Sequence, residues 1–202
     1  MHAMNRPLVA AALLGALAVV SPGLAQAPAA PAVEFAQADL PAKQKELLAR
    51  YADSVARWAM VQRVVEAVVE QNERTLTAER IQEIDRQWQD GGNPGGLVGE
   101  LSRNECAQAL QALLAANPGY AEVFVADSRG ALVCMSSRTS DYYQGDEEHF
   151  VRAWAGGAGG RFVAASHRDE SMGLEMVHIA VPVRSGGRAV GVLTAGRILG
   201  GG

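Results

Sequence analysis

The amino-acid sequence predicts an α+β domain in which a long N-terminal helix and several short helices pack on a five-stranded antiparallel sheet. Two observations carry this prediction. Before about residue 118, apolar residues recur every three or four positions, which is the period of an amphipathic helix. After it, apolar segments with a period of two are separated by short turns rich in Gly, Asp and Ser, which indicates strands joined by hairpins.

The N-terminal half contains three expected helices, of which the first covers about 42–72. The apolar stripe of this helix consists of Leu48, Tyr51, Val55, Trp58, Val61, Val65 and Val69. Thr77 is expected to cap the second helix, and the glycine-rich stretch 91–96 ends it. A capping-box pattern at Ser102–Glu105 opens the third helix, which ends before Asn117.

The C-terminal half supplies the strands and one more helix. The expected strands cover 121–126, 131–136, 161–166, 174–183 and 188–198. Residues 127–130 join the first two as a hairpin, and 185–187 form the tight turn between the last two. Between the second and third strands we expect a short helix with Asp146 as its N-cap and with Phe150 and Trp154 on one face.

The N-terminus has the pattern of a secretory signal peptide. Arg6 supplies positive charge, Leu8 to Val20 is an unbroken apolar run, and small residues follow. The run is shorter than the ~20 residues that a membrane-spanning helix needs. We therefore expect a signal peptide over 1–27, a flexible leader over 28–41 and a single domain over 42–199, in a protein that is periplasmic or secreted.

Charge and cysteine content narrow the function classes. The chain has 18 Lys and Arg against 22 Asp and Glu, a net charge of -4, and no basic cluster. This balance argues against nucleic acid and against an anionic membrane surface as partners. Cys106 and Cys134 are both expected to point inward. They are either a disulfide, which would close a loop of about 28 residues and contribute roughly 3 to 4 kcal/mol, or two buried thiols.

The stretch 138–154 concentrates side chains that suit a small polar ligand. It contains Arg138, Thr139, Ser140, Asp141, Tyr142, Tyr143, Gln144, His149 and Trp154. Aromatic walls exclude water while a few fixed polar groups set the orientation of a ligand. Arg138 can pair with a carboxylate, and Asp141 or Asp169 can accept an ammonium group. The alternative is that the aromatic residues belong to the core and that the aspartates cap local turns.

The run Thr139–Glu147 (Thr-Ser-Asp-Tyr-Tyr-Gln-Gly-Asp-Glu) resembles a motif in one branch of the PAS-like extracytoplasmic sensors called Cache or PDC domains. Shorter strings follow the order of that family. They are Ile81–Trp88, Glu122–Asp127 with Gly130, Asp169–Ser171, Val181–Val183 and Gly191–Leu193. The resemblance covers roughly 45–198. It implies that the segment between the second and third strands covers one face of the sheet and that a ligand binds beneath it.

On this resemblance we expect an exported, small-molecule-binding sensor module that is not an enzyme and needs no cofactor. Its expected ligand is an amino acid, a carboxylate or an amine. The expected ligand-binding residues are Arg138, Ser140, Asp141, Tyr142, Tyr143, Gln144, His149, Trp154, Asp169 and Ser171. Members of the family usually feed a kinase or a receptor, and the sequence ends at Gly202 without such a domain. We therefore expect output through a separate membrane receptor or kinase.

Two other classes stay open at this point. The first is a protein-interaction domain with a vestigial pocket, and the stripe of 48–69, above all its first half, is close enough to a heptad repeat to support a homodimer. The second is a metal-dependent enzyme using His167, Asp169 and His178. The sequence contains neither His-Glu-x-x-His nor Gly-x-Ser-x-Gly, which disfavours the enzyme.

Overall fold

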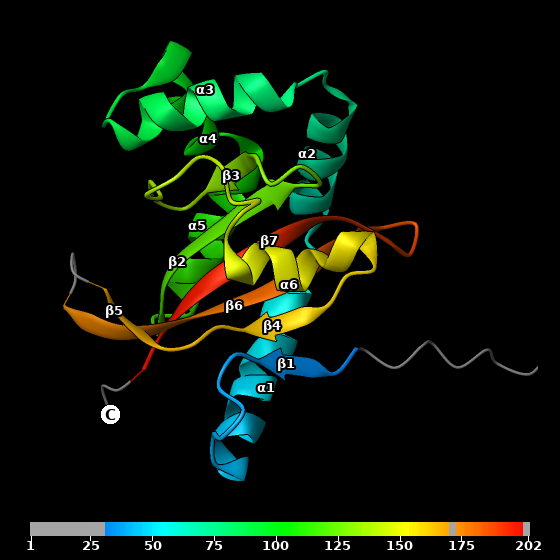
Figure 1. Cartoon of the computed structure of the whole chain (residues 1–202), viewed down its shortest axis with the longest axis vertical. Coiled ribbons are helices and arrows are strands. Elements are labelled where there is room, and N and C mark those ends of the chain that lie inside the picture. Colours follow the sequence, from blue (N-terminus) through cyan, green and yellow to red (C-terminus); the bar gives the residue numbers. More distant parts are fainter. Residues whose placement is uncertain (1–30, 170–172, 200–202) are drawn as a thin grey trace, which may run out of the picture. The chain divides into compact units, whose positions relative to one another are not determined.

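The computed structural model describes residues 31–169 and 173–199, which form the helices and strands drawn in Figure 1. The helices are α1 (Ala42–Trp58), α2 (Gln62–Glu73), α3 (Ala78–Gln89), α4 (Leu97–Leu101), α5 (Glu105–Ala116) and α6 (Glu148–Trp154), with short 3-10 turns η1 (Pro94–Gly96) and η2 (Ala155–Gly157). The strands are β1 (Val33–Phe35), β2 (Tyr120–Asp127), β3 (Leu132–Met135), β4 (Arg161–Val163), β5 (His167–Asp169), β6 (Leu174–Ser185) and β7 (Arg188–Ile198).

The strands form one sheet in the order β1-β4-β6-β7-β2-β3, with β5 paired to β6. The five expected strands are present as β2, β3, β4, β6 and β7, and neighbours among them are antiparallel. The expectation of five strands in an antiparallel sheet is wrong in count and direction. Within the described residues the sheet has seven strands, and β1 runs parallel to β4.

Strand β1 lies in the stretch that was expected to be a flexible leader. Val33, Glu34 and Phe35 pair with Arg161, Phe162 and Val163. Residues from Pro31 onward belong to one compact unit, so the domain begins before residue 42. The reason is physical: a free edge at β4 would leave backbone N–H and C=O groups unpaired, and β1 supplies their partners. The expected signal peptide over 1–27 lies outside the described residues.

The expected long helix over 42–72 is also wrong, because it is two helices, α1 and α2. The chain turns at Ala59 and Met60, and Val61 has an extended backbone. A continuous helix would carry the apolar face from Ala59 onto Gln62 and Glu66, which are both exposed. The break rotates the buried face, and the residues of α2 that are buried are Val64, Val68 and Gln71.

Helices α1, α2 and α5 pack on one face of the sheet and enclose the main core. From the helices Val55, Val64 and Leu110 meet Ile179 and Leu193 of the central strands, and all five are fully buried. Such a core stabilises the fold by roughly 1.5 to 3 kcal/mol for each large apolar side chain buried.

A disulfide joins Cys106 of α5 to Cys134 of β3 within this core. Of the two alternatives that the sequence leaves open, the structure therefore has the bridge rather than two thiols. It links a helix to the strand at the end of the sheet order, 28 residues apart in the chain.

The other face of the sheet is covered by α6 over β4, β6 and β7, and by α3 and α4 near β3. Figure 1 shows α6 in front of the sheet, with α1 behind it. Beneath α6, Phe150 packs with Phe162, Ala180 and Val192. Beneath α3, Trp88 and Ile84 pack with Phe124, Leu132 and Met135. This face carries the segment whose composition suggested a ligand site.

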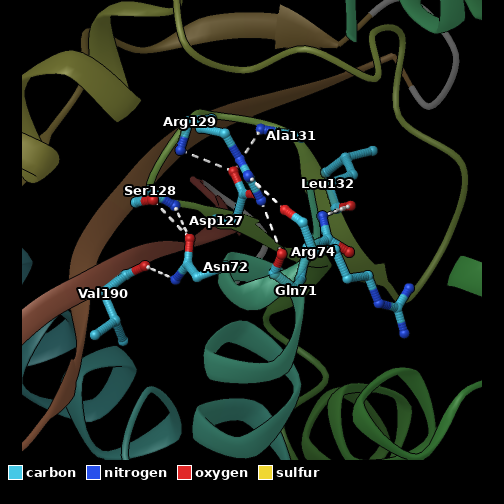
Figure 2. A network of polar contacts seen from close by, with 9 residues as sticks. All are labelled: Gln71, Asn72, Arg74, Asp127, Ser128, Arg129, Ala131, Leu132 and Val190. Atoms are coloured by element: carbon cyan, nitrogen blue, oxygen red, sulfur yellow. Dashed lines mark hydrogen bonds and ion pairs between the residues drawn. The ribbon is translucent and has the colours of Figure 1, made fainter. Parts of the chain in front are cut away.

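A network of polar groups, most of them partly or fully buried, joins helix α2 to the β2–β3 turn (Figure 2). The Asp127 carboxylate, which is completely buried, accepts hydrogen bonds from the Arg129 guanidinium at 2.7 and 3.0 Å. Arg129 also donates to the carbonyls of Gln71 and Arg74 at the end of α2, at 2.8 and 2.9 Å. The network therefore caps the C-terminus of the helix and fixes the expected hairpin turn at 127–130 against it.

The helix caps are partly as expected. The Thr77 hydroxyl accepts a hydrogen bond from the Arg80 amide, which confirms it as the cap of α3. Helix α5 is capped by Asn104 and not by the expected box at Ser102, whose hydroxyl donates to the Val98 carbonyl because α4 occupies the preceding residues. The N-cap of α6 is Glu147 and not Asp146.

Candidate functional site

The motif Thr139–Glu147 is bound to helix α3 through Asp85. One carboxylate oxygen of Asp85 accepts hydrogen bonds from the backbone amides of Tyr142 and Tyr143, both at 2.9 Å. The indole N–H of Trp88, one turn further along the same helix, donates to the Thr139 carbonyl at 2.9 Å. The motif is thus attached to α3 by side chains that come from one face of that helix.

Arg138 closes the end of α3. Its guanidinium donates to the Trp88 carbonyl at 2.6 Å and to the Gly92 carbonyl at 2.9 Å, and it lies 4.8 Å from the centre of the Trp88 ring. A cation at the C-terminus of a helix is favourable because unpaired carbonyls meet there. The charge that was expected to pair with a ligand carboxylate therefore serves the fold.

The polar residues that follow make contacts within the chain. Asp141 accepts hydrogen bonds from the Ser140 hydroxyl at 2.5 Å and from the Gln89 amide at 2.7 Å. The Gln144 amide donates to the Asp141 carbonyl at 2.9 Å. These hydrogen bonds hold the loop in one conformation, which agrees with the alternative interpretation of the aspartates as turn residues.

The aromatic residues that were expected to form one wall have three different surroundings. Tyr142 is buried against Trp88, with ring centres 5.9 Å apart, and burial raises its pKa to about 12. Tyr143 lines a small pocket of about 110 Å³ with Ala78, Ile81 and Arg129. Trp154 stacks on Phe150 at 6.3 Å, on the core side of α6.

The described structure brings together a different set of polar groups beneath α6. His149 of α6, His178 of β6 and His167 of β5 form a row, with ring centres 5.2 and 5.0 Å apart. Phe124 of β2 lies edge-on to both His149 and His178, at 5.8 and 6.1 Å. Glu122 of β2 completes the set, and we call these five residues the histidine row.

Glu122 and His178 meet across an intervening strand. The Glu122 carboxylate lies 2.8 Å from His178 Nε2, although β2 and β6 are not neighbours in the sheet. Gly196 of β7 is the backbone partner of both residues. Because glycine has no side chain, nothing separates the carboxylate from the imidazole, and a Cβ at this position would lie 2.9 Å from Glu122 Cγ.

His149 is the buried member of the row. It is 7% exposed, and its Nε2 has no hydrogen-bond partner in the parts of the chain that the structure describes. Burial, together with the charges of His178 and His167, lowers its pKa to about 3, so the ring is neutral at physiological pH. Buried polar nitrogens are nearly always paired, so this atom marks a place where a partner is expected.

The carboxylate of Glu147 stands at the start of α6, near the row. Burial raises its pKa, the charges of Asp141 and Asp146 raise it further, and His178 lowers it. The row therefore combines a neutral imidazole, two further imidazoles and the Glu122 carboxylate, with the Glu147 carboxylate near it. Such groups can bind a ligand that carries both N–H donors and oxygen acceptors.

Of the ten expected ligand residues, His149 alone lies in the histidine row. Ser171 lies outside the described residues, and nothing is described of the Asp169 side chain. Glu122 was not singled out for binding, and His178 and His167 were weighed only as metal ligands. The available indication was a charged or imidazole side chain inside a strand of otherwise apolar and small residues. Within 31–169 and 173–199 no group of three or more His, Cys, Asp and Glu has the arrangement of a metal site.

Comparison with known proteins gives structural neighbours only. No protein-family model matches the chain, and no curated protein matches it. Among solved structures, the sensor domain of the V. cholerae histidine kinase DctB has 13% identity and a TM-score of 0.45, and the match covers 75% of this chain and 49% of that one.

Two chemoreceptor domains are also similar. The ligand-binding domain of the Pseudomonas aeruginosa PAO1 amino acid chemoreceptor PctC, in complex with GABA, has 19% identity and a TM-score of 0.40 over 59% of this chain and 56% of that one. That of Campylobacter jejuni Tlp3, in complex with 4-methylisoleucine, has 12% identity and a TM-score of 0.39 over 75% and 60%. The chain thus spans about half to three fifths of the length of these structures.

Proposed function

We propose that this chain is an exported sensor module of the Cache/PDC type, which binds a small organic ligand beneath α6 and acts through a separate membrane receptor or kinase. The observation that carries the proposal is the unpaired Nε2 of His149, which is buried next to His178, the partner of Glu122. The likeness of Thr139–Glu147 to the family motif supports it, since this segment leads directly into α6.

The position of the histidine row agrees with the face that the resemblance implies for the ligand. Helix α6 and the segment before it come between β3 and β4 in the sequence, and α6 packs on β4, β6 and β7. His149 of α6 meets Phe124 and His178 of the strands, so the row lies between the helix and the sheet. Ser171 belongs to the β5–β6 connection, which begins after Asp169, two residues beyond His167. Ligand contacts from Asp169 and Ser171 remain part of the proposal.

The charges of the row favour a ligand with an ammonium or other N–H donor. Glu122 supplies a carboxylate, and a neutral His149 can accept a hydrogen bond through an unprotonated ring nitrogen. Amines and amino acids meet this requirement better than simple carboxylates do. Because Arg138 is committed to the end of α3, we place no ligand carboxylate there.

A thermal-shift screen against amino acids, amines and carboxylates tests the proposal. A ligand that binds only the folded state raises the melting temperature by mass action. At a concentration of a hundred times its dissociation constant, it adds roughly 2.7 kcal/mol to the free energy of unfolding. We expect hits among amines and amino acids. A folded sample that gives no hit at millimolar concentration contradicts the proposal.

Two variants locate the binding of any hit. His149→Phe keeps an aromatic ring of similar size but removes the ring nitrogens, and it is expected to weaken binding about tenfold or more. Val151→Ala is the matched control, because Val151 lies on the exposed side of the same helix. Equal affinity of wild type and His149→Phe would place the ligand elsewhere.

Export and the partner need separate tests. Cell fractionation is expected to find the mature protein outside the cytoplasm and shortened at the N-terminus. No helix among the described residues has the length and hydropathy to cross a membrane. Crosslinking in cells is expected to capture a membrane receptor or kinase, and capture that persists without any ligand effect would favour the interaction class.

Homodimerisation through the stripe at 48–69 also stays a proposal, and the packing limits it. Leu48 and Val55 are buried in the chain's own core, and Tyr51 is partly buried against it. A second copy of the chain would have to contact another side of α1, such as the one that exposes Leu47. Light scattering of wild type against Leu47→Glu tests this arrangement.

A further inference from the structure

A pocket lies on the α1 side of the sheet, on the face opposite to the histidine row. It has a volume of about 300 Å³ and is bounded by Tyr51 and Ser54 of α1, by the α5–β2 connection at Gly119, and by Tyr120 and Arg197. A bulge between Tyr120 and Glu122 separates these two residues. It turns Tyr120 toward the α1 side, while Glu122 points to the histidine row.

Arg197 forms one wall of this pocket, and its planar group is held by aromatic rings. The guanidinium carbon lies 4.4 Å from the centre of the Tyr51 ring and 5.1 Å from that of Tyr120. One terminal nitrogen donates to the Tyr51 hydroxyl at 3.2 Å. A guanidinium stacked in this way keeps a fixed orientation and leaves its edge available for hydrogen bonds.

Among the described residues, no acidic group neutralises this cation. In those parts of the chain Arg197 forms no ion pair with a carboxylate. Arg57, on the same side of α1, is likewise free of ion pairs there and donates to the Ser54 hydroxyl at 2.9 Å. Burial raises the pKa of Tyr120, and the charges of Arg197 and Arg57 oppose that rise.

Two buried polar atoms at this pocket lack partners. The Tyr120 hydroxyl and Arg197 Nε are both buried and, within 31–169 and 173–199, neither has a hydrogen-bond partner. Groups of this kind are usually satisfied by water or by a bound molecule. Both unpaired atoms here belong to residues that line the pocket.

Gly119 leaves the space that the Arg197 guanidinium occupies. A Cβ on this residue would overlap Arg197 Nη1, so only glycine lets the side chain lie against the α5–β2 connection. The pocket is therefore shaped by a glycine at one wall, aromatic rings at another and an unpaired cation between them. These features match a carboxylate with an organic body, because the planar fork binds both carboxylate oxygens while the rings contact carbon.

We propose that the Arg197 pocket binds a small organic carboxylate, with the carboxylate on Arg197 and the organic part against Tyr51 and Tyr120. This site is distinct from the histidine row, which lies on the other face of the sheet. The two sites differ in charge preference, since the row offers the Glu122 carboxylate and imidazoles whereas the pocket offers the Arg197 guanidinium.

The test uses benzoate, acetate and succinate as probes, measured by NMR titration of the full mature protein. At least one probe is expected to bind with a dissociation constant below about 10 mM, and benzamide, the neutral analogue of benzoate, is expected to bind at least about tenfold more weakly. Failure of all three carboxylates overturns the proposal. Equal binding of benzamide and benzoate overturns it as well, because the carboxylate would then play no part.

Variants place the binding. Arg197→Gln removes the charge and is expected to weaken probe binding about tenfold or more. Arg188→Gln removes an exposed charge from the first residue of β7 and is the matched control. Gly119→Ala displaces the guanidinium without changing any charge, so it gives a second measurement if Arg197→Gln fails to fold. Unchanged affinity in a folded Arg197→Gln or Gly119→Ala protein contradicts the proposal.

Two further titrations distinguish the Arg197 pocket from the histidine row and from a general anion site. His149→Phe is expected to leave benzoate binding unchanged, and a loss would show that the probe occupies the histidine row. Inorganic phosphate is expected to compete weakly. If phosphate competes as well as benzoate does, the pocket binds anions in general and the assignment to organic carboxylates is wrong.

Discussion

Glu122 and His178 are joined at 2.8 Å across a strand that separates them, because the residue between them is Gly196. The contact needs three strands in register, and it places a carboxylate and an imidazole on the sheet beneath α6. His149 and His167 flank the imidazole. The histidine row is thus a property of the assembled sheet and not of any one segment.

Gly196→Ala is expected to break this contact. The added Cβ would lie 2.6 Å from the Met176 sulfur and 2.9 Å from Glu122 Cγ, so both side chains must move. Overpacking of this kind costs about 1 to 3 kcal/mol, which urea unfolding measures. The Glu122→Gln variant, which keeps the size of the side chain, should unfold close to wild type. Equal stability of Gly196→Ala and wild type would show that the strands adjust without loss.

Stability is expected to fall as the pH falls from about 6.5 toward 3. The pKa of His149 is lowered from 6.5 to about 3 in the folded state, first by burial. Between these values the unfolded chain binds a proton that the folded chain does not, so acid favours unfolding by up to about 1.4 kcal/mol per pH unit. Urea unfolding at several pH values checks this, and His149→Phe should lose that part of the slope. An identical slope in the variant would mean that another group is responsible.

Asp127→Ala is expected to destabilise the protein strongly. It leaves the Arg129 guanidinium without its buried counter-charge and removes the acceptor for two backbone amides of the turn. Removal of one partner of a buried pair costs about 3 to 5 kcal/mol. Asp146→Ala is the control, because Asp146 is exposed and does not cap α6, and it should change stability by less than about 0.5 kcal/mol. A small effect of Asp127→Ala on chemical unfolding would contradict the importance of the network.

Asp85→Ala is expected to loosen the motif at 139–147. Its carboxylate accepts from the amides of Tyr142 and Tyr143, and each amide left unpaired costs about 1 to 3 kcal/mol. Hydrogen exchange at these two amides should accelerate, while exchange in the central strands should change only as far as global stability does. Asp85→Asn keeps an acceptor oxygen and should be intermediate. Unchanged exchange at these two amides in Asp85→Ala would show that Asp85 does not hold the motif on α3.

Reduction of the Cys106–Cys134 disulfide is expected to lower stability by roughly 3 to 4 kcal/mol, since the bridge limits the unfolded chain over 28 residues. Thiol alkylation followed by mass spectrometry should find no free thiol in protein purified without a reductant. The double variant Cys106→Ala with Cys134→Ala should match the reduced protein. Alkylation of both cysteines under native, oxidising conditions would contradict the bridge.

Much of the fold could be predicted because local patterns decide it. The five expected strands, the turn at 127–130 and the Thr77 cap depend on neighbouring residues, and the structure has all of them. The break at Ala59–Val61 was missed because a stripe of period 3.6 looks continuous in sequence, although Gln62 and Glu66 on its face were an indication. Strand β1 was missed because a parallel pairing with β4 spans more than a hundred residues.

The sequence indicated the face of the sheet on which the histidine row lies, but not most of the residues that form the row. Asp85 binds residues that are 57 and 58 positions away, and no local rule anticipates that. A carboxylate among Ile81, Ile84 and Trp88 on a buried helix face was nevertheless an indication that it had a partner. The opposition of Glu122 and His178 depends on register across three strands, which sequence alone does not supply.

The proposed function depends on a small ligand pairing with the buried nitrogen of His149, and NMR of the histidine side chains observes that pairing. The protein is labelled with ¹⁵N and titrated with the strongest amine or amino acid found in the screen. We expect the Nε2 resonance of His149 to shift with saturation and to be absent in His149→Phe. A ligand that saturates the protein while the ring nitrogens of His149, His167 and His178 stay unchanged would contradict the proposal.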